Sequence, residues 1–472
     1  MVIKERRFIS KIYAVFFCLC LVLLSFGLLP QKTIAASITC STSACLTTAL
    51  SNAAPGDVIT LAAGVTFSGV FVASANGTSA NPIILQSDSS NKAILEGPGT
   101  SANYNLHMTG DYWIVKNVKI TNAKKGIVLD NANYTLIDNV EVYHIGEEAI
   151  HYRDGSSFNT LQNSNIYDIG TVNPQYGEGV YVGSDVGKWG SFVKETDHNV
   201  IKNNVIGPNV RAESIDIKEG ATGTIVEGNT FDGTGISGAN AADSFIDIKG
   251  NNSIIRNNIG YRNNNPQIND AFQTNEKSPG WGYNNDIYNN VVDMNNAAGY
   301  VINVKAGSAN ACNNTRTPAG NMYLGAVTSY TSCSDDITPS TPIKFTVPAA
   351  NVTASTSDFN LPARAVDGSL STRWSGEGDG AWIKFDLGSS KTVAFIKIAF
   401  YDASKRTFTF DIQTSVDGTV WTTHSVGLQN ALNNNLQTFD IADSTARYVR
   451  IIGHGNTKNA WNSYTEVEVW GL

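Results

Sequence analysis

Short strand-like segments that mix apolar and polar residues recur along the chain between about residues 105 and 305. One set superimposes at residues 113–117 (WIVKN), 136–139 (LIDN), 160–163 (TLQN), 200–203 (VIKN), 225–228 (IVEG), 254–257 (IIRN) and 286–289 (DIYN). The last residues of these segments are 22, 24, 40, 25, 29 and 32 positions apart. One coil of a parallel β-helix takes roughly twenty-odd residues, so the pattern predicts stacked coils with loops where the spacing is longer.

A second set of segments lies within the same repeats and carries unlike polar residues at matching places. Its members are residues 125–130 (KGIVLD), 148–153 (EAIHYR), 178–183 (EGVYVG), 213–218 (ESIDIK) and 244–249 (SFIDIK), and the next two coils supply Gln273 with Asn275 and Asn303 with Lys305. A propeller would need longer units of several strands, and leucine-rich repeats need a Leu pattern that the chain lacks. The recurring Asn suits left-handed turns, and its amide can form a ladder along the stack.

Other segments bound the repeats. Residues 44–52 predict a short helix that caps the first coil, with the strand-like residues 58–61 after it. Residues 334–348, which contain three Pro among Ser, Thr and Asp, predict a linker. The alternating segments of residues 349–472 predict an antiparallel sandwich. The chain is therefore expected to be all-β, with a β-helix over residues 37–333 and a sandwich after it.

The N-terminus predicts a secretory signal peptide over residues 1–36. Four basic residues precede the apolar run of residues 12–29, and the small residues Ala35, Ala36 and Ser37 follow it. A membrane anchor is the alternative, because the run is nearly long enough to span a bilayer, but the small residues favour cleavage. The mature protein is therefore expected to be secreted and extracellular, with no membrane insertion after cleavage.

Composition narrows the possible partners. The formal net charge of −8 argues against nucleic acid and against a membrane surface as partners.

Beyond the leader, the chain has four cysteines, an even number that suits disulfide bonds in an oxidising compartment: Cys40, Cys45, Cys312 and Cys333. Local pairs Cys40–Cys45 and Cys312–Cys333 are the simplest connectivity, and no CxxC or cluster of His favours the rival zinc site. A monomer is expected.

The second strand set presents a candidate active face. Strand alternation places Ile215 in the core and Asp216 with Lys218 on the outer face, while a turn must bring Glu213 there. Stacked coils are about 4.8 Å apart, so Asp247 and Lys249 should lie beside their counterparts. Close like charges would lower a Lys pKa towards that of a working base. His151, Arg153 and Tyr181 lie on the same stripe, and the carboxylates Glu148, Glu178 and Glu213 have the oxygen character that Ca²⁺ prefers.

These residues carry a resemblance. Residues 43–333 resemble the pectate-lyase-like right-handed parallel β-helix superfamily, and Glu213 with Lys218 is similar to the metal ligand and base of the alginate lyase and chondroitinase B family. The resemblance implies Ca²⁺-assisted β-elimination on a uronate polysaccharide, with Lys218 as base and Glu213 as a calcium ligand. The elimination also needs a proton donor for the leaving oxygen, and Tyr181 or His151 is a candidate either for that role or for a substrate contact. Similarity to the Lys-dependent pectate lyases would instead favour Lys249, with Asp216, Asp243 and Asp247 around the metal.

Two other functions fit the same face. An inverting glycoside hydrolase would use Asp216, Asp247 and Asp243 as acid and base, but inversion needs carboxyl groups roughly 6.5–9.5 Å apart, wider than stacked Asp residues allow. A surface protein that only binds glycan is the third possibility. The alternative without a function is a solvent-exposed face whose opposite charges merely pair across coils. Two consecutive Ile-Asp-Ile-Lys segments favour a functional site over this alternative.

Residues 349–472 resemble a discoidin, or coagulation factor type C, carbohydrate-binding domain. The matching segments are residues 365–368 (AVDG), 372–374 (TRW), 413–418 (QTSVDG), 447–451 (RYVRI) and 465–469 (TEVEV). The resemblance implies a structural Ca²⁺ at Asp367 and Glu466. Aromatic and cationic residues in loops suit sugar stacking and carboxylate pairing, and the candidates are Tyr401, Lys405, Arg406, His454, Asn459 and Trp461. An acidic polysaccharide is the expected partner.

Overall fold

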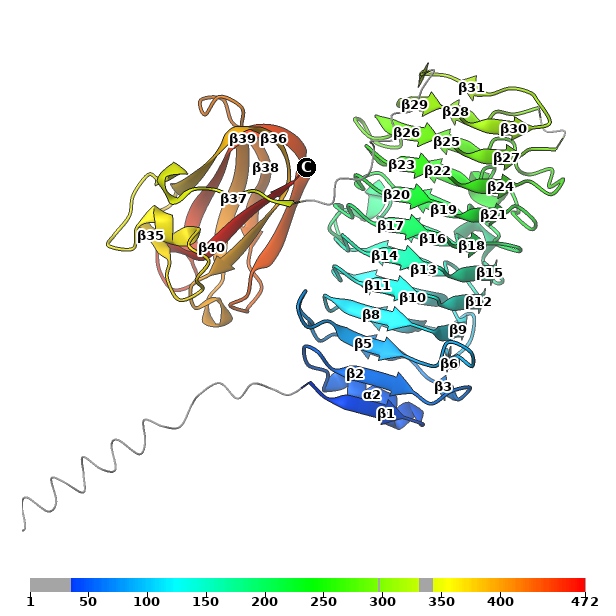
Figure 1. The fold of residues 1–472 in the computed structure, drawn as a ribbon, viewed down its shortest axis with the longest axis horizontal. Coiled ribbons are helices and arrows are strands. Elements are labelled where there is room, and N and C mark those ends of the chain that lie inside the picture. The colour runs from blue at the N-terminus through cyan, green and yellow to red at the C-terminus, as the bar shows by residue number, and fades with distance from the viewer. Residues whose placement is uncertain (1–34, 296–297, 331–342, 472) are drawn as a thin grey trace, which may run out of the picture.

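The computed structural model describes residues 35–295, 298–330 and 343–471. Most of the chain up to Ser329 winds into a parallel β-helix whose coils each contribute a strand to sheets A, B and C (Figure 1). Within the described ranges, no helix is long and apolar enough to cross a membrane. The predicted leader lies almost wholly outside the described residues, and so does most of the predicted linker.

Sheet A contains the first set of segments predicted from the sequence and has 12 strands. In spatial order these are β1 (Ser37–Cys40), β2 (Val58–Leu61), β5 (Ile83–Gln86), β8 (Trp113–Lys116), β11 (Leu136–Asp138), β14 (Thr160–Gln162), β17 (Val200–Lys202), β20 (Ile225–Glu227), β23 (Ile254–Arg256), β26 (Asn285–Tyr288), β29 (Ala309–Cys312) and β32 (Val327–Ser329).

Sheet B has 10 strands and was not anticipated as a separate sheet. Its members are β3 (Thr66–Ser68), β6 (Ala93–Glu96), β9 (Val118–Ala123), β12 (Glu141–Ile145), β15 (Asn165–Ile169), β18 (Val205–Ile206), β21 (Thr230–Asp232), β24 (Ile259–Tyr261), β27 (Val291–Asp293) and β30 (Thr315–Thr317).

Sheet C contains the second predicted set and also has 10 strands. They are β4 (Phe71–Ala73), β7 (Tyr104–Met108), β10 (Lys125–Asp130), β13 (Ile150–Arg153), β16 (Val180–Val182), β19 (Ile215–Ile217), β22 (Ile246–Ile248), β25 (Phe272–Thr274), β28 (Ile302–Val304) and β31 (Tyr323–Leu324).

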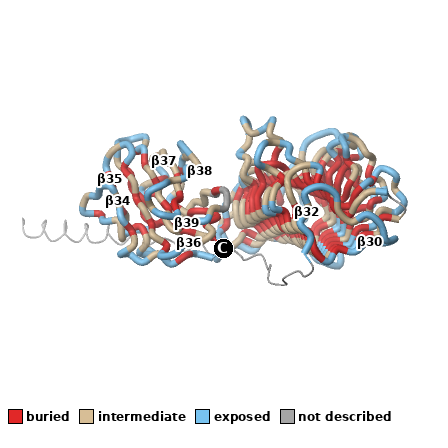
Figure 2. Tube along the Cα trace, turned by 90° about the horizontal axis from the view of Figure 1, so that it is seen from above, coloured by how far each residue is buried: buried red, intermediate tan, exposed pale blue. Residues whose placement is uncertain are grey.

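The core of the β-helix is a set of aligned apolar columns. In sheet C, Ile150, Val180, Ile215, Ile246 and Phe272 pair directly across successive strands and are fully buried. Figure 2 shows buried residues gathered along the coils of the β-helix. Because strand side chains alternate, each inward apolar residue fixes an outward neighbour, which sets the register of the outer face.

Asparagine stabilises the turn between sheets A and B in two ways. Asn203 and Asn257 have the positive φ expected of the recurring position, and Gly228 replaces Asn there. The residue after each one is turned inwards: Asn229 Nδ2 donates to Asn258 Oδ1 at 3.0 Å within a buried ladder. The buried ladder therefore lies one residue beyond the position that the sequence suggested.

The N-terminal end is closed by α2 (Ser43–Ser51), the single α-helix of the described residues, as predicted. Thr42 caps it by accepting from the Cys45 amide at 3.2 Å. The disulfide Cys40–Cys45 joins this helix to β1 and confirms the first predicted pair. Cys312 is disulfide-bonded, and its predicted partner Cys333 lies outside the described residues.

The C-terminal domain is an antiparallel sandwich. Its eight strands are β33 (Ile343–Lys344), β34 (Val352–Ala354), β35 (Trp374–Glu377), β36 (Ala381–Phe400), β37 (Phe408–Ser415), β38 (Thr422–Gln429), β39 (Gln437–Asn456) and β40 (Trp461–Gly471). Ile343 and Lys344 already pair with β40, and Phe345 is buried. The sandwich therefore begins at residue 343, and the predicted linker end at residue 348 was too late.

The sandwich contacts the side of the β-helix through aromatic side chains. The rings of Phe158 and Phe395 meet edge to face with centroids 4.6 Å apart. Lys397 Nζ lies 4.8 Å from the ring centroid of Tyr134. Figure 1 shows the two domains side by side, with the C-terminal domain against the turns that lead into sheet A.

Candidate functional site

The polar residues predicted to share one face form one column on the outside of sheet C. His151, Tyr181, Asp216, Asp247 and Gln273 are direct partners in successive strands. The register follows from their buried neighbours in each strand, so the prediction that Asp216 and Asp247 adjoin is confirmed. Five polar side chains of four kinds thus lie one after another across about 20 Å of the sheet.

Lys249 is held between the two aspartates of this column. Its Nζ lies 2.7 Å from Asp216 Oδ1 and 2.6 Å from Asp247 Oδ2. Burial alone would lower the pKa of Lys249, but the adjacent carboxylates outweigh it and hold the pKa well above the usual value. The expectation that neighbouring lysines lower this pKa was wrong, because the charges of Asp216, Asp247 and Glu213 raise it by more than burial lowers it. Lys249 is therefore a firmly protonated, structural cation.

The aspartate pair is committed to the same ion pair. Asp247 also accepts from Asn275 Nδ2 at 2.6 Å. Burial opposes ionisation of Asp247, but Lys249 and Asn275 together lower its pKa. Asp243 does not join the pair; its Oδ2 lies 3.5 Å from Lys305 and accepts from Asn269. The acid and base that a glycoside hydrolase needs are therefore not assembled from these residues.

Lys218 is the other lysine of the face and is less constrained. Its Nζ lies 3.6 Å from Asp185, 3.7 Å from Glu219 and 4.0 Å from Asp216, so it has three carboxylate neighbours but none at close hydrogen-bonding distance. Its ammonium also lies 5.7 Å from the ring centroid of Tyr181. Lys218 can therefore move towards a ligand at small cost, unlike Lys249.

Tyr181 and His151 lie next to each other, with ring centroids 4.6 Å apart. Burial, and then the charges of Asp216 and Glu178, raise the pKa of Tyr181 well above its usual value. Burial, and then Lys125, lower the pKa of His151 well below its usual value. Its Nε2 donates to the carbonyl of Gly183 at 3.1 Å, so His151 is neutral and packs against Tyr181.

Three glutamates border the column, and they differ in their partners. Glu148 makes a very short ion pair with Lys125. Glu178 keeps Oε2 buried with no hydrogen-bond partner, and its pKa is raised well above normal by burial, then by Glu148 and Asp216. Burial, then Asp216, raises the pKa of Glu213 to about 8. Glu178 and Glu213 therefore lie where the acidic groups are not fully neutralised by nearby cations.

This acidic environment decides how well Ca²⁺ would fit. The oxygen donors of Glu178 and Glu213 and the unsatisfied Oε2 suit a hard divalent cation. Among the described residues, however, no three His, Cys, Asp or Glu side chains are gathered closely enough to hold a metal. The two glutamates would therefore supply part of a coordination shell, which the uronate carboxylate of a substrate and water would complete.

Arg153 is the remaining predicted residue of the stripe, and it lies on β13, two strands of sheet C away from β19. Its guanidinium donates to both oxygens of Asp130, at 2.6 and 2.7 Å, and stacks 4.5 Å from the ring of Phe192. Burial disfavours the charged guanidinium, but Asp130 stabilises it more strongly, so the pKa of Arg153 is raised. Arg153 is therefore occupied by a structural pair.

Two residues around Lys218 were not anticipated. Asp185 lies in the connection after β16, and Glu219 directly follows Lys218. Glu219 Oε1 accepts from the Val186 amide at 2.7 Å, which ties this connection to the next coil. The step of 40 residues between repeats was the one signal in the sequence that pointed to this connection.

In the C-terminal domain, the predicted sugar-binding loops gather at one end. The amide of Thr457 donates to the carbonyl of Thr407, and that of Gly378 donates to Ala460, each at 2.9 Å. Tyr401 is covered by Arg373, whose guanidinium lies 3.9 Å from its ring centroid, and Arg406 lies at 5.6 Å.

Ion pairs order the charged residues at this end. Lys405 Nζ lies 3.2 Å from Asp402. His454 lies between Asp379 (2.6 Å) and Asp411 (3.1 Å), and the hydrogen bond that its Nδ1–H donates to Asp379 is the main cause of its raised pKa. Trp461, the residue predicted to stack on sugar, pairs through its backbone with Glu377 and therefore lies next to β35.

The predicted structural Ca²⁺ site of this domain has its two acids close together. Glu466 Oε2 accepts from the Gly368 amide at 3.1 Å, and Asp367 accepts from Thr372 at 2.7 Å. Burial raises the pKa of Glu466, and the charge of Asp367 contributes. The Asp-Gly loop and the C-terminal Glu therefore meet as the resemblance implied.

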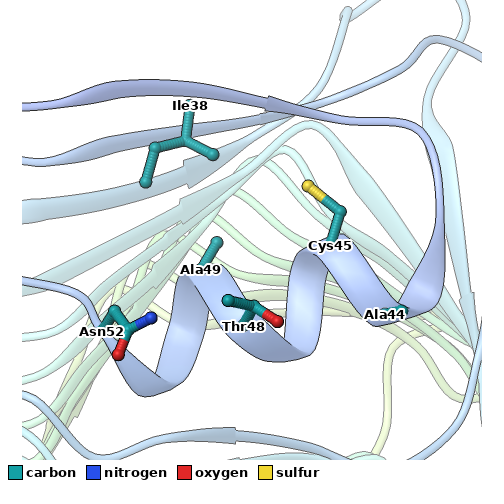
Figure 3. A pocket seen from close by; sticks show the side chains of 6 residues that line it. All are labelled: Ile38, Ala44, Cys45, Thr48, Ala49 and Asn52. Carbon is teal, nitrogen blue, oxygen red and sulfur yellow. The ribbon is translucent and has the colours of Figure 1, made fainter.

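One apolar pocket lies away from both sites, beside α2 (Figure 3). It is lined by Ile38, Ala44, Cys45, Thr48, Ala49 and Asn52. Cys45 is disulfide-bonded, and the lining offers no group that titrates near neutral pH. The pocket therefore has no means of acid–base chemistry.

Comparison with known proteins matches both domains. Residues 30–183 match the family described as Pel9A-like, right handed beta helix region, and residues 351–467 match the F5/8 type C domain. The crystal structure of an alginate lyase from Paenibacillus sp. str. FPU-7 is 53% identical, with a TM-score of 0.62, over 62% of this chain and 99% of that chain.

Two further similarities are more limited. Pectate lyase L from Dickeya chrysanthemi is 24% identical over 97 residues, which are 20% of this chain and span only 23% of that enzyme's length. A solved CBM32 domain of AlyQ, in complex with 4,5-unsaturated mannuronic acid, is 42% identical over 28% of this chain and 99% of that chain, with a TM-score of 0.27.

Proposed function

The chain belongs to the polysaccharide lyases built on a Pel9A-like right-handed β-helix, with a carbohydrate-binding F5/8 type C domain attached, and from this premise we propose that it cleaves alginate by β-elimination. The substrate is inferred from the 53% identity to an alginate lyase over almost the whole of that enzyme. The site supports it through one observation above all: two proton-carrying groups, Tyr181 and Lys218, adjoin on the outer face of sheet C.

β-Elimination breaks the C5–H and C4–O4 bonds of a uronate and forms a C4=C5 double bond. It needs one group to take the C5 proton and another to protonate the leaving O4. A divalent cation at Glu178 and Glu213 would neutralise the uronate carboxylate, which acidifies C5–H, and would offset the charges that raise the pKa of Tyr181. The residues of the chain have the remaining tasks of binding the sugar and moving the two protons.

The surroundings of the two groups suggest how they divide these tasks. Lys218 has Asp185, Asp216 and Glu219 within 4.0 Å but no close hydrogen bond to any of them, so its Nζ can turn to a bound sugar and donate a proton to O4. Tyr181 is then the group that takes the C5 proton, which requires a bound cation to offset the charges of Asp216 and Glu178 that raise its pKa. This assignment exchanges the roles expected from the sequence, where Lys218 was the base, and it leaves Lys249 to hold Asp216 and Asp247 in place.

A glycoside hydrolase is supported less well. Asp216 and Asp247 pair directly on adjacent strands and share Lys249, so neither is free to act as a general acid opposite the other. The geometry therefore favours elimination over hydrolysis.

The test is the ultraviolet absorbance of the unsaturated uronate that forms when the protein meets alginate, pectate or glucuronan, with and without chelator. We expect signal on alginate that falls with chelator, and that disappears in Lys218→Ala and Tyr181→Phe. Lys305→Ala is the matched control, because Lys305 lies on the same sheet but contacts Asp243. No signal on any uronate polymer would refute the proposal.

We also propose that the protein is secreted and acts as a monomer. The support is the basic, apolar and small-residue pattern of residues 1–36 and the disulfide Cys40–Cys45 just beyond it. Mass spectrometry of the protein from culture medium should give an N-terminus near Ser37; an intact N-terminus in the cell pellet would contradict secretion.

A further inference from the structure

The connections that follow the strands of sheet C differ in length in a way that singles out the reactive coils. Those after β16 (residues 183–199) and β25 (residues 275–284) are long, whereas those after β19 (residues 218–224) and β22 (residues 249–253) are short. The two short connections begin at Lys218 and Lys249. Two long loops therefore flank the ends of the two coils that carry the lysines.

The two loops meet above these coils. Strands β16 and β25 are three coils apart, about 14 Å. Nevertheless, the indole rings of Trp189 and Trp281 lie edge to face with centroids 6.3 Å apart. The side chains therefore bridge the ends of β19 and β22.

A lysine accompanies the aromatic pair. Lys194 Nζ lies 5.3 Å from the ring centroid of Trp189 and 6.0 Å from that of Trp281. Trp189 is fixed by its Nε1, which donates to the carbonyl of Ser184 at 3.1 Å. Both indoles remain half-buried, so part of each ring is open to solvent. A pair that only braced the loops would be expected to bury its apolar surface.

The bridge is connected directly to the proposed proton donor. Asp185, at the start of the first loop, lies 3.6 Å from Lys218. Burial disfavours the carboxylate form of Asp185, but the Gly187 amide, Lys218 and Lys277 together lower its pKa. A cation of the second loop, Lys277, and Lys218 therefore both lie near the start of the first loop. A sugar in contact with the bridge would thus be next to the bond that breaks.

We propose that Trp189, Trp281 and Lys194 form a uronate-binding subsite beside Lys218. An indole face packs on the C–H face of a pyranose, and Lys194 pairs with the carboxylate of that unit. This inference rests on the proposed lyase activity and adds the residues that position the polymer. It assigns to the two loops a function in binding.

The test uses the full-length protein and alginate oligosaccharides too short to reach both domains. An aromatic contact contributes about 0.5–1.5 kcal/mol, and tenfold corresponds to about 1.4 kcal/mol, so Trp281→Ala should raise KM by about two- to twelvefold. Trp281→Phe should recover most of the loss, and Lys194→Gln should raise KM while Lys194→Arg does not. Tyr143→Ala is the control, because Tyr143 stacks on Tyr167 at 5.3 Å on sheet B.

Three outcomes separate the possibilities. If the wild-type protein makes no unsaturated product, the proposed function fails. If it is active and both Trp281→Ala and Lys194→Gln keep the wild-type KM, the subsite is overturned while the lyase stands. If Trp281→Ala does not fold, Lys194→Gln decides alone: an unchanged KM overturns the subsite, and a raised KM supports it.

Discussion

Replacing Lys249 by Met should destabilise the β-helix strongly. The ammonium lies 2.7 Å from Asp216 and 2.6 Å from Asp247, and all three groups are largely shielded from water. Its removal leaves two carboxylates on adjacent strands, about 4.8 Å apart, with no cation between them. Losing one partner of a buried ion pair costs about 3–5 kcal/mol. At about 2 °C per kcal/mol for a domain of this size, the melting temperature should fall by about 6–10 °C.

Differential scanning calorimetry measures this shift, and Lys218→Met is the matched control. The nearest carboxylate lies 3.6 Å from Lys218, and Asp216 keeps Lys249 in that variant, so the melting temperature should fall less than in Lys249→Met. Adding Asp247→Asn to Lys249→Met should restore about half of the lost stability, because one uncompensated charge is removed. An unchanged melting temperature for Lys249→Met, together with full loss of activity, would refute the structural role and return Lys249 to catalysis.

Three further predictions follow from other parts of the molecule. The pKa of Glu213 rises from 4.5 to about 8 on folding, so the folded state holds this proton more tightly and stability should fall as the pH rises from 4.5 to 8. Melting curves recorded between pH 4.5 and 8 should show a smaller loss of stability with rising pH in Glu213→Gln than in the wild-type protein. Asn229→Ala removes the buried acceptor of the Asn204 amide and should cost about 2–4 kcal/mol in denaturant unfolding, whereas a loss below about 0.5 kcal/mol would contradict a stabilising ladder. Phe395→Ala removes the ring in contact with Phe158 and should increase the radius of gyration in X-ray scattering without changing cleavage of short oligosaccharides.

Much of the fold could be predicted because the repeats are local and regular. Ile215 and Ile217 alternate with Asp216 in three consecutive positions, and the same pattern returns at 246–248, which fixes which side faces the core and how the coils align. Sheet B escaped notice because its strands, such as β18 (Val205–Ile206), are short and differ in sequence from coil to coil. The sandwich start at Ile343 was also missed, because Pro342 and Pro348 surround a two-residue strand whose partner, β40, lies at the far end of the chain.

The candidate site was predicted in its members but less well in their roles. The column His151, Tyr181, Asp216 and Asp247 is confirmed by the register of sheet C. The two lysines, however, occupy equivalent places in identical Ile-Asp-Ile-Lys segments, and sequence alone could not separate them. The pKa of a lysine depends on the distance to each carboxylate, and those distances are set by rotamers and by neighbouring coils.

The sequence by itself determined the β-helix, the sandwich, the outward column and the chemical class of the site, because apolar periodicity and residue type are local properties. The tertiary structure alone decided that Lys249 is enclosed by Asp216 and Asp247 while Lys218 faces Tyr181. It also brought Trp189 and Trp281 together across 92 positions of sequence (281 minus 189). The physical reason is that charge states and long-range contacts depend on separations of a few ångströms between coils, which only stacking of the whole chain defines.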